Sequence, residues 1–150
     1  MPNPVYQIEM SRTLCYPATE AFKVVEDVER FPEFMPNVNS VTLLEAVGQR
    51  KVAAWSATLD DAPLDWVEEG IYDPENCVVR FRALDGVFDR FDGFWRVSPD
   101  GEGSRVTFVL AYEIGLPEIE EIVGPLLRQR MIENAESMLA AIEKRVGENR

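Results

Sequence analysis

Residues 117–146 read PEIEEIVGPLLRQRMIENAESMLAAIEKRV, and this stretch decides how the rest of the chain can fold. Its apolar residues recur every three or four positions, the spacing of one face of an α-helix. Acidic residues in its first turn and basic residues in its last turn suit the helix dipole. From Pro125 to Val146 such a helix would be about 33 Å long at 1.5 Å per residue. The stretch predicts a long C-terminal helix with one apolar stripe, formed by Ile119, Ile122, Val123, Leu126, Leu127, Met131, Ala135, Met138, Leu139, Ile142 and Val146.

The residues that precede this helix mostly alternate between apolar and polar side chains, which is the period of a half-buried strand. One strand is predicted at 5–14, and Pro17 then opens the first of two short helical segments that end before Pro36. Short connections rich in Asp, Gly and Pro separate the later strands, so neighbours are expected to pair antiparallel. These six further strands are predicted at 38–47, 51–59, 64–72, 77–84, 88–98 and 105–114.

Seven antiparallel strands need a cover for their apolar face, and the C-terminal stripe is the only element large enough to supply it. We therefore expect an α+β fold in a single domain over residues 1–150, with a curved seven-stranded antiparallel sheet wrapped around the long helix. A sheet that grips one helix leaves a gap between the two, and a ligand can bind there.

Composition excludes several classes of chemistry. The chain of 150 residues has no histidine, which rules out a Ser-His-Asp triad, a histidine general base and histidine-ligated zinc or iron. Its two cysteines, Cys15 and Cys77, lie far apart in the sequence, and no nucleotide-binding glycine fingerprint is present. We therefore expect neither a metal nor an organic cofactor.

Charge and hydropathy bear on partners and location. The formal net charge is −12 and the pI is about 4.4, so phosphate backbones and anionic membrane surfaces should repel the protein. No apolar stretch reaches the ~18 residues of a membrane helix, and the N-terminus does not resemble a signal peptide. A cytoplasmic protein without nucleic-acid binding or integral membrane association is predicted.

Three strings resemble segments of the START-like, helix-grip (SRPBCC) superfamily. They are DVERFPEF at 27–34, DGVF followed by GFW at 85–95, and GSRVTF at 103–108. They are most similar to the branch of polyketide cyclase/aromatases and coenzyme Q-binding proteins. The resemblance implies a helix-grip fold and one of three functions: aldol cyclisation of a polyketide, transport of a lipid or quinone, or ribosome association. The acidic net charge argues against the last of these.

The resemblance implies an arginine in the cyclase cavity at Arg82, which is the first candidate catalytic group, and the neighbouring Arg80 is a candidate for ligand binding. The alternation with Val79 and Phe81 instead points both arginines to solvent, where they could pair with Glu68 or Glu69. Both alternatives stay open from the sequence alone. Glu68 is a second candidate catalytic group, because it could supply a carboxylate to the cavity, or it could be a charge at the rim. Two positions depart from the cyclase pattern. Gly70 stands where the pattern has an arginine, and Val38 stands near the position where the pattern has a tyrosine.

The remaining candidates for ligand binding are mainly aromatic residues on the predicted inner face of the sheet. Such residues are either ordinary core or the wall of a cavity, and in a helix-grip fold the two coincide. On the long helix, a polar residue in phase with the apolar stripe should face the same cavity. These candidates are Trp55, Trp66, Phe91, Trp95, Phe108, Tyr112, Asn134 and Met138.

Two functions compete at this point. The first is a cofactor-independent polyketide aromatase/cyclase, which folds a poly-ketone chain and promotes aldol closure and dehydration. Its substrate could be delivered by an acyl carrier protein. The candidates for docking such a carrier are Arg128 and Arg130 on the long helix, with Arg90 and Arg96 on the outward face of the strand at 88–98. The second is a non-catalytic lipid or quinone carrier. At least two charged groups inside the cavity would favour the enzyme, and a wholly apolar cavity would favour the carrier.

Overall fold

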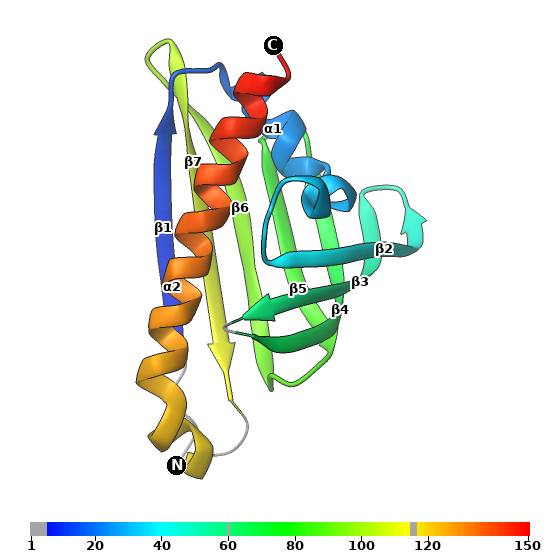
Figure 1. Ribbon diagram of the computed structural model, residues 1–150. Helices are drawn as coiled ribbons and strands as arrows, with labels where there is room; N and C mark the ends of the chain where they lie inside the picture. The colour runs from blue at the N-terminus through cyan, green and yellow to red at the C-terminus, as the bar shows by residue number, and fades with distance from the viewer. Residues whose placement is uncertain (1–5, 60, 115–116) are drawn as a thin grey trace.

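The computed structural model describes residues 6–59, 61–114 and 117–150. The chain begins with a strand, continues through two short helices and six more strands, and ends in a long helix (Figure 1). The elements are β1 (Tyr6–Leu14), α1 (Ala18–Glu26), the 3-10 helix η1 (Val28–Glu33), β2 (Val38–Val47), β3 (Arg50–Leu59), β4 (Ala62–Asp73), β5 (Val78–Asp85), β6 (Arg90–Asp100), β7 (Gly103–Glu113) and α2 (Pro117–Glu148).

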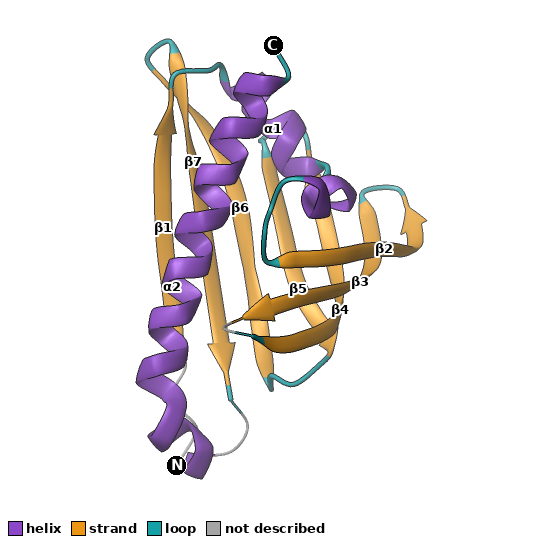
Figure 2. Cartoon of the chain, viewed as in Figure 1, coloured by secondary structure: helices purple, strands orange, loops and turns teal. Residues whose placement is uncertain are grey.

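All strands form one antiparallel sheet in the order β1-β7-β6-β5-β4-β3-β2. The sheet is strongly curled, and β2 and β3 run nearly across the direction of β1 and β7 (Figure 2). The long helix α2 lies along the concave side and packs against β1 and α1. The predicted helix-grip fold of class α+β is confirmed.

Period-two alternation builds the concave face. On β7, Val106, Phe108 and Leu110 are all nearly inaccessible to solvent and point toward α2. The apolar stripe of α2 meets them, and each fully buried side chain of this kind stabilises the fold by about 1.5–3 kcal/mol. The buried members of the stripe are Met131, Ala135, Leu139, Ile142 and Val146.

Polar contacts fix α2 at several points along its length. Near its middle, Arg128 Nη1 donates to the backbone oxygen of Gln7 on β1 at 3.0 Å. Farther along, Arg12 on β1 forms an ion pair with Glu143 at 2.8 Å. In its last turn, Arg145 pairs with Glu33 of η1 at 2.6 Å. These contacts hold the helix against β1 and η1.

The two short helices close one end of the curled sheet. Pro17 precedes α1 with a φ of −59°, where its missing N–H costs no hydrogen bond. Phe31 of η1 is fully buried and meets Trp55 and Trp95 edge-on, with ring centroids 5.9 and 6.2 Å away. Phe31, in the DVERFPEF segment noted in the sequence, therefore lines one end of the space between sheet and helix.

Candidate functional site

A cavity of about 80 Å³ lies between the concave face of the sheet and α2. Ordinary ligand pockets have volumes of roughly 300–1,000 Å³, so anything larger than a small ring must displace side chains to enter. The lining is dominated by aromatic and aliphatic side chains. The described residues that line it are Phe31, Asn37, Val38, Trp55, Ala57, Thr58, Leu59, Leu64, Trp66, Glu68, Phe81, Phe88, Phe91, Trp95, Phe108, Leu110, Met131, Asn134 and Met138.

The aromatic wall is continuous across the sheet. Trp55 on β3 and Trp66 on β4 face each other in register and stack with ring centroids 5.6 Å apart. Trp66 also meets Phe91 at 5.4 Å. On the other side, Trp95 and Phe108 lie 4.4 Å apart. All three tryptophans of the chain thus line the cavity, and these five residues stand where the inward alternation of their strands places them.

Glu68 is the one ionisable side chain among the described residues of the lining. It follows Trp66 by two residues on β4, so both point to the inner face. Trp66 Nε1 donates a hydrogen bond to Glu68 Oε1 at 3.1 Å. Removal of the carboxyl from water raises the pKa of Glu68 to about 8, although the tryptophan hydrogen bond opposes this rise. Glu68 is therefore mostly protonated at neutral pH and can donate as well as accept a hydrogen bond.

Two asparagines supply further polar groups. Asn37 Nδ2 donates to Asn134 Oδ1 at 3.0 Å, which joins the segment before β2 to α2 across the edge of the cavity. Asn134 was expected on the cavity side of the helix, and the structure places it there together with Met138. Asn37 was missed, because it lies in a turn after Pro36 where no periodic pattern gives a direction.

The expectation that Arg82 faces the cavity is wrong. On β5, Val79 and Phe81 are buried on the inner face, so the alternation turns Arg80 and Arg82 to the convex face. Both arginines are exposed, and Arg82 Nε pairs with Glu69 at 2.8 Å. Of the two alternatives left open by the sequence, solvated arginines paired with a neighbouring glutamate are what the structure contains.

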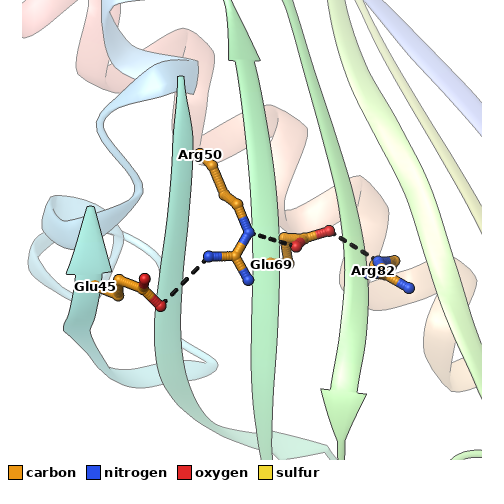
Figure 3. Close-up of polar contacts among 4 residues, drawn as sticks. All are labelled: Glu45, Arg50, Glu69 and Arg82. Carbon is orange, nitrogen blue, oxygen red and sulfur yellow. Dashed lines mark hydrogen bonds and ion pairs between the residues drawn. The ribbon is translucent and has the colours of Figure 1, made fainter. Parts of the chain in front are cut away.

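These outward charges form a chain across four strands (Figure 3). Arg50 on β3 contacts Glu45 on β2 at 3.3 Å and Glu69 on β4 at 2.6 Å. Glu69 also binds Arg82 on β5. The hydrogen bonds from Arg82 and then from Arg50 lower the pKa of the Glu69 carboxyl. Two adjacent glutamates of β4 therefore have opposite protonation behaviour, because one faces the cavity and the other faces two arginines.

Tyr112 is not part of the cavity lining, contrary to expectation. Its side chain is fully buried at the far end of β7, stacked on Tyr6 with centroids 5.3 Å apart. Phe88, which does line the cavity, packs edge-on against it at 5.9 Å. Among the described residues the Tyr112 hydroxyl has no hydrogen-bond partner, and burial raises its pKa to about 12.

The structure also explains one departure from the cyclase pattern. Gly70 lies on the inner face of β4, and a Cβ placed there would come within 2.9 Å of Tyr72 Cε1. The tyrosine ring therefore occupies the space that a long side chain at position 70 would need. Val38, the second departure, is buried and contributes only apolar surface to the cavity.

Gly86, in the turn between β5 and β6, allows a close approach of the backbone to the aromatic wall. Its φ is +151°, and a Cβ there would lie 2.8 Å from the Cβ of Trp66. The DGVF string of the sequence therefore forms a turn whose glycine packs closely against Trp66.

Neither a cluster of metal ligands nor a membrane-spanning helix is found in the part of the chain that the structure describes. Over residues 6–59, 61–114 and 117–150, no three acidic or cysteine side chains gather where they could hold a metal ion. None of the helices described is both long and apolar enough to cross a membrane.

The comparisons with solved structures agree with this architecture. The protein TTHA0849 from Thermus thermophilus superposes with a TM-score of 0.88 at 31% identity, covering 94% of this chain and 97% of that protein. The Zhui aromatase/cyclase from Streptomyces sp. R1128 superposes equally well, with a TM-score of 0.88 over 96% of this chain and 94% of that one. Its identity is 17%, so this second likeness concerns the fold alone.

Sequence comparisons give two further findings. The ribosome association toxin RatA of Pseudomonas aeruginosa is 26% identical over 123 residues, which is 81% of this chain and 85% of the toxin. A family model described as polyketide cyclase / dehydrase and lipid transport matches residues 14–139. That match covers most of the chain and includes the cavity-lining residues named above. The chain therefore belongs to the polyketide cyclase/dehydrase and lipid transport family.

Proposed function

We propose that this protein binds a small, largely apolar ligand in the cavity beneath α2 and anchors the ligand's polar group on the Glu68 carboxyl. The observation that carries the proposal is one protonatable carboxyl set in a wall of stacked aromatic rings. A buried polar group without water gains most from a ligand that completes its hydrogen bonds. The rings supply apolar contact, and Glu68 supplies orientation.

A catalytic role in aldol cyclisation and dehydration is the finer form of this proposal. It rests on Glu68, because a carboxyl with a pKa of about 8 can give and take a proton near neutral pH. It lacks the arginine that was expected to polarise a carbonyl, since Arg82 lies on the opposite face of the sheet. With one inward ionisable group and two asparagines, the cavity is neither wholly apolar nor doubly charged, and a lipid or quinone carrier remains the alternative.

Delivery by an acyl carrier protein is less well supported than a freely diffusing ligand. Arg128 is engaged with the backbone of Gln7, and Arg130 pairs with Glu133 at 3.1 Å. Arg90, on the outward face, pairs with Asp92 at 2.7 Å. These three arginines already have partners within the chain, and Arg96 lies over the Phe94 ring, 5.4 Å from its centroid. Bulk charge would also repel an acidic carrier. We include a cytoplasmic location in the proposal.

The similarity to RatA favours a second candidate, association with the ribosome. The net charge of −12 opposes it, because binding to RNA gains most of its free energy from basic residues that displace counterions. We therefore rank it behind ligand binding. Co-sedimentation of the purified protein with ribosomal subunits at low salt tests it directly, and a stable co-sedimenting complex would reverse this ranking.

Ligand binding is tested with the neutral fluorescent probe N-phenyl-1-naphthylamine, whose emission rises in apolar surroundings. Ala57→Phe should abolish binding, because Ala57 lines the cavity and a benzyl group would fill it. Ala54→Phe is the matched control, since Ala54 belongs to the same strand but borders a hollow on the outer face. Met138→Phe is a second way to fill the cavity from α2. Unchanged probe binding in both cavity-filled variants, with their folding verified, would refute the proposal.

The catalytic form has its own test. A poly-β-ketone thioester incubated with the protein should yield cyclised, dehydrated product. Loss of one general acid or base typically slows a reaction about 10²–10⁴-fold, so Glu68→Gln should slow product formation by that much. Probe binding without any product would leave the carrier alternative.

A further inference from the structure

The cavity has a one-sided distribution of charge. Of its described lining residues, Glu68 alone can carry a charge, and neither lysine nor arginine is among them. Arg80 and Arg82 are the arginines of the sheet that are nearest to Glu68 in sequence, and both point away from the cavity. A ligand carboxylate or phosphate would therefore enter an apolar space that offers it no cation.

We propose that the cavity selects hydrophobic amines: ligands with an aromatic or aliphatic body and one protonated amino group, bound against the carboxylate of Glu68 and the faces of the surrounding rings. This inference rests on the proposed function, because it names the ligand class of the same site.

The geometry around Glu68 suits an ammonium group. Trp66 donates to Oε1, and within the described structure Oε2 accepts no hydrogen bond, so it is left for a ligand N–H. Trp55, Trp66 and Phe91 line the same cavity as Glu68, with neighbouring ring centroids 5.4–5.6 Å apart. A cation over such faces gains electrostatic attraction that is largest where water is excluded.

The proton balance is favourable. When an amine binds, its ammonium form stays protonated and the Glu68 carboxyl releases its proton to solvent. With a pKa of about 8, this release weakens binding only about tenfold at pH 7. A charge-assisted hydrogen bond and contact with the rings can each offset a factor of that size. An anionic ligand has no such compensation.

One described basic side chain, that of Lys51, also lies on the inner face of the sheet, but it already has an acidic partner. Lys51, on the inner face of β3, lies with Nζ 4.8 Å from the ring centre of Tyr72 and 4.0 Å from Glu29. Its charge is thus opposed by a carboxylate, and Lys51 is not part of the lining. Burial, and after it the charges of Glu68, Glu29, Asp27 and Glu26, raise the pKa of Tyr72, which therefore stays neutral beside Glu68. The charge of −12 on the whole protein further concentrates cations at its surface.

The test uses three ligands of one shape: 1-naphthylmethylamine, 1-naphthylmethanol and 1-naphthoic acid. Each competes with N-phenyl-1-naphthylamine for the protein at pH 7.5. We expect the amine to bind at least tenfold more tightly than the alcohol, and the acid to bind most weakly. Amine affinity should rise as the pH increases from 6 to 8, because a smaller fraction of the free protein then has a protonated Glu68 that must lose its proton on binding. Calorimetry in buffers of different ionisation enthalpy should show proton release on amine binding.

Two variants isolate the role of Glu68. Glu68→Gln should lose the preference for amine over alcohol and the proton release, while it still binds the alcohol. Glu69→Gln, the neighbour that faces the opposite side of the sheet, should keep both. If the alcohol binds as tightly as the amine, or if Glu68→Gln keeps the preference, the amine inference is refuted and the hydrophobic-ligand function stands. If neither the neutral probe nor any of the three ligands binds, both are refuted.

Discussion

Replacement of Glu68 by glutamine keeps the shape of the side chain and removes its ability to ionise. The Trp66 Nε1–H can still donate to the amide oxygen of the variant, so the hydrogen bond at 3.1 Å is retained. The variant therefore isolates one property, the proton that the folded protein holds on a buried carboxyl. Its effect should depend on pH in a way that can be derived from the site.

The pKa of Glu68 is about 8 in the folded protein, against an ordinary value of 4.5. Below pH 4.5 both the folded and the unfolded chain hold this proton, so Glu68 adds no pH dependence. Between 4.5 and about 8 the folded protein binds more protons than the unfolded chain. The free energy of unfolding therefore falls with rising pH by about 1.4 kcal/mol per pH unit. Over that interval the loss is roughly 5 kcal/mol, and it levels off above pH 8.

Glu68→Gln should therefore lie within about 1 kcal/mol of the wild type at pH 5 and exceed its stability at pH 9 by several kcal/mol. Urea unfolding at pH 5, 7 and 9, followed by tryptophan fluorescence, measures this difference. Glu69→Gln is the matched control with the opposite sign, because its two arginines lower the pKa of that carboxyl. That variant should be less stable than the wild type at neutral pH and should approach it as the pH falls. A constant difference between Glu68→Gln and wild type across the pH range would show that Glu68 ionises as an ordinary surface carboxyl.

Three further substitutions test other parts of the site. Gly86→Ala should destabilise the protein by about 1–3 kcal/mol in urea unfolding, because its φ is +151° and its Cβ would meet Trp66; an unchanged midpoint would contradict the close contact. Tyr112→Phe should leave stability unchanged or raise it by about 1 kcal/mol, since it removes a buried hydroxyl without a described partner; a marked loss would reveal a partner. Arg82→Ala should leave probe affinity unaltered, because its side chain binds Glu69 outside the cavity; weaker binding would place Arg82 in the site after all.

The aromatic part of the site could be predicted from the sequence because the alternation along a strand determines on which face of the sheet each side chain lies. Trp55, Trp66 and Trp95 each occupy a position whose parity assigns it to the apolar face. The same parity places Arg82 outside, and the error at that residue came from giving the resemblance to the cyclase pattern equal weight. Local alternation was the better guide. To turn Arg82 inward, the strand would have to present its other face to the cavity, and Val79 and Phe81 would then be exposed to solvent.

The polar part of the site depended on contacts between distant segments. Asn37 and Asn134 are 97 residues apart in the sequence, and nothing local predicts that their amides meet. The raised pKa of Glu68 likewise needs the surrounding rings to exclude water, and those rings come from several strands and η1. Parity could place Glu68 inside, but it could not distinguish a carboxylate at the rim from a protonated acid in a cavity.

The seven strands, the long helix and most of the apolar faces that join them could be predicted from the sequence, because hydrophobic periodicity acts within each segment. The predicted stripe was too long at its start, since Val123 and Leu126 are exposed. Which charges lie inside was a different matter, and it depended on the folded arrangement. Glu68 and Glu69 are chemically identical neighbours, yet one is held neutral by burial and the other is held ionised by two arginines. Solvation and Coulomb interactions depend on distances across the sheet, and those distances exist only once the chain has folded.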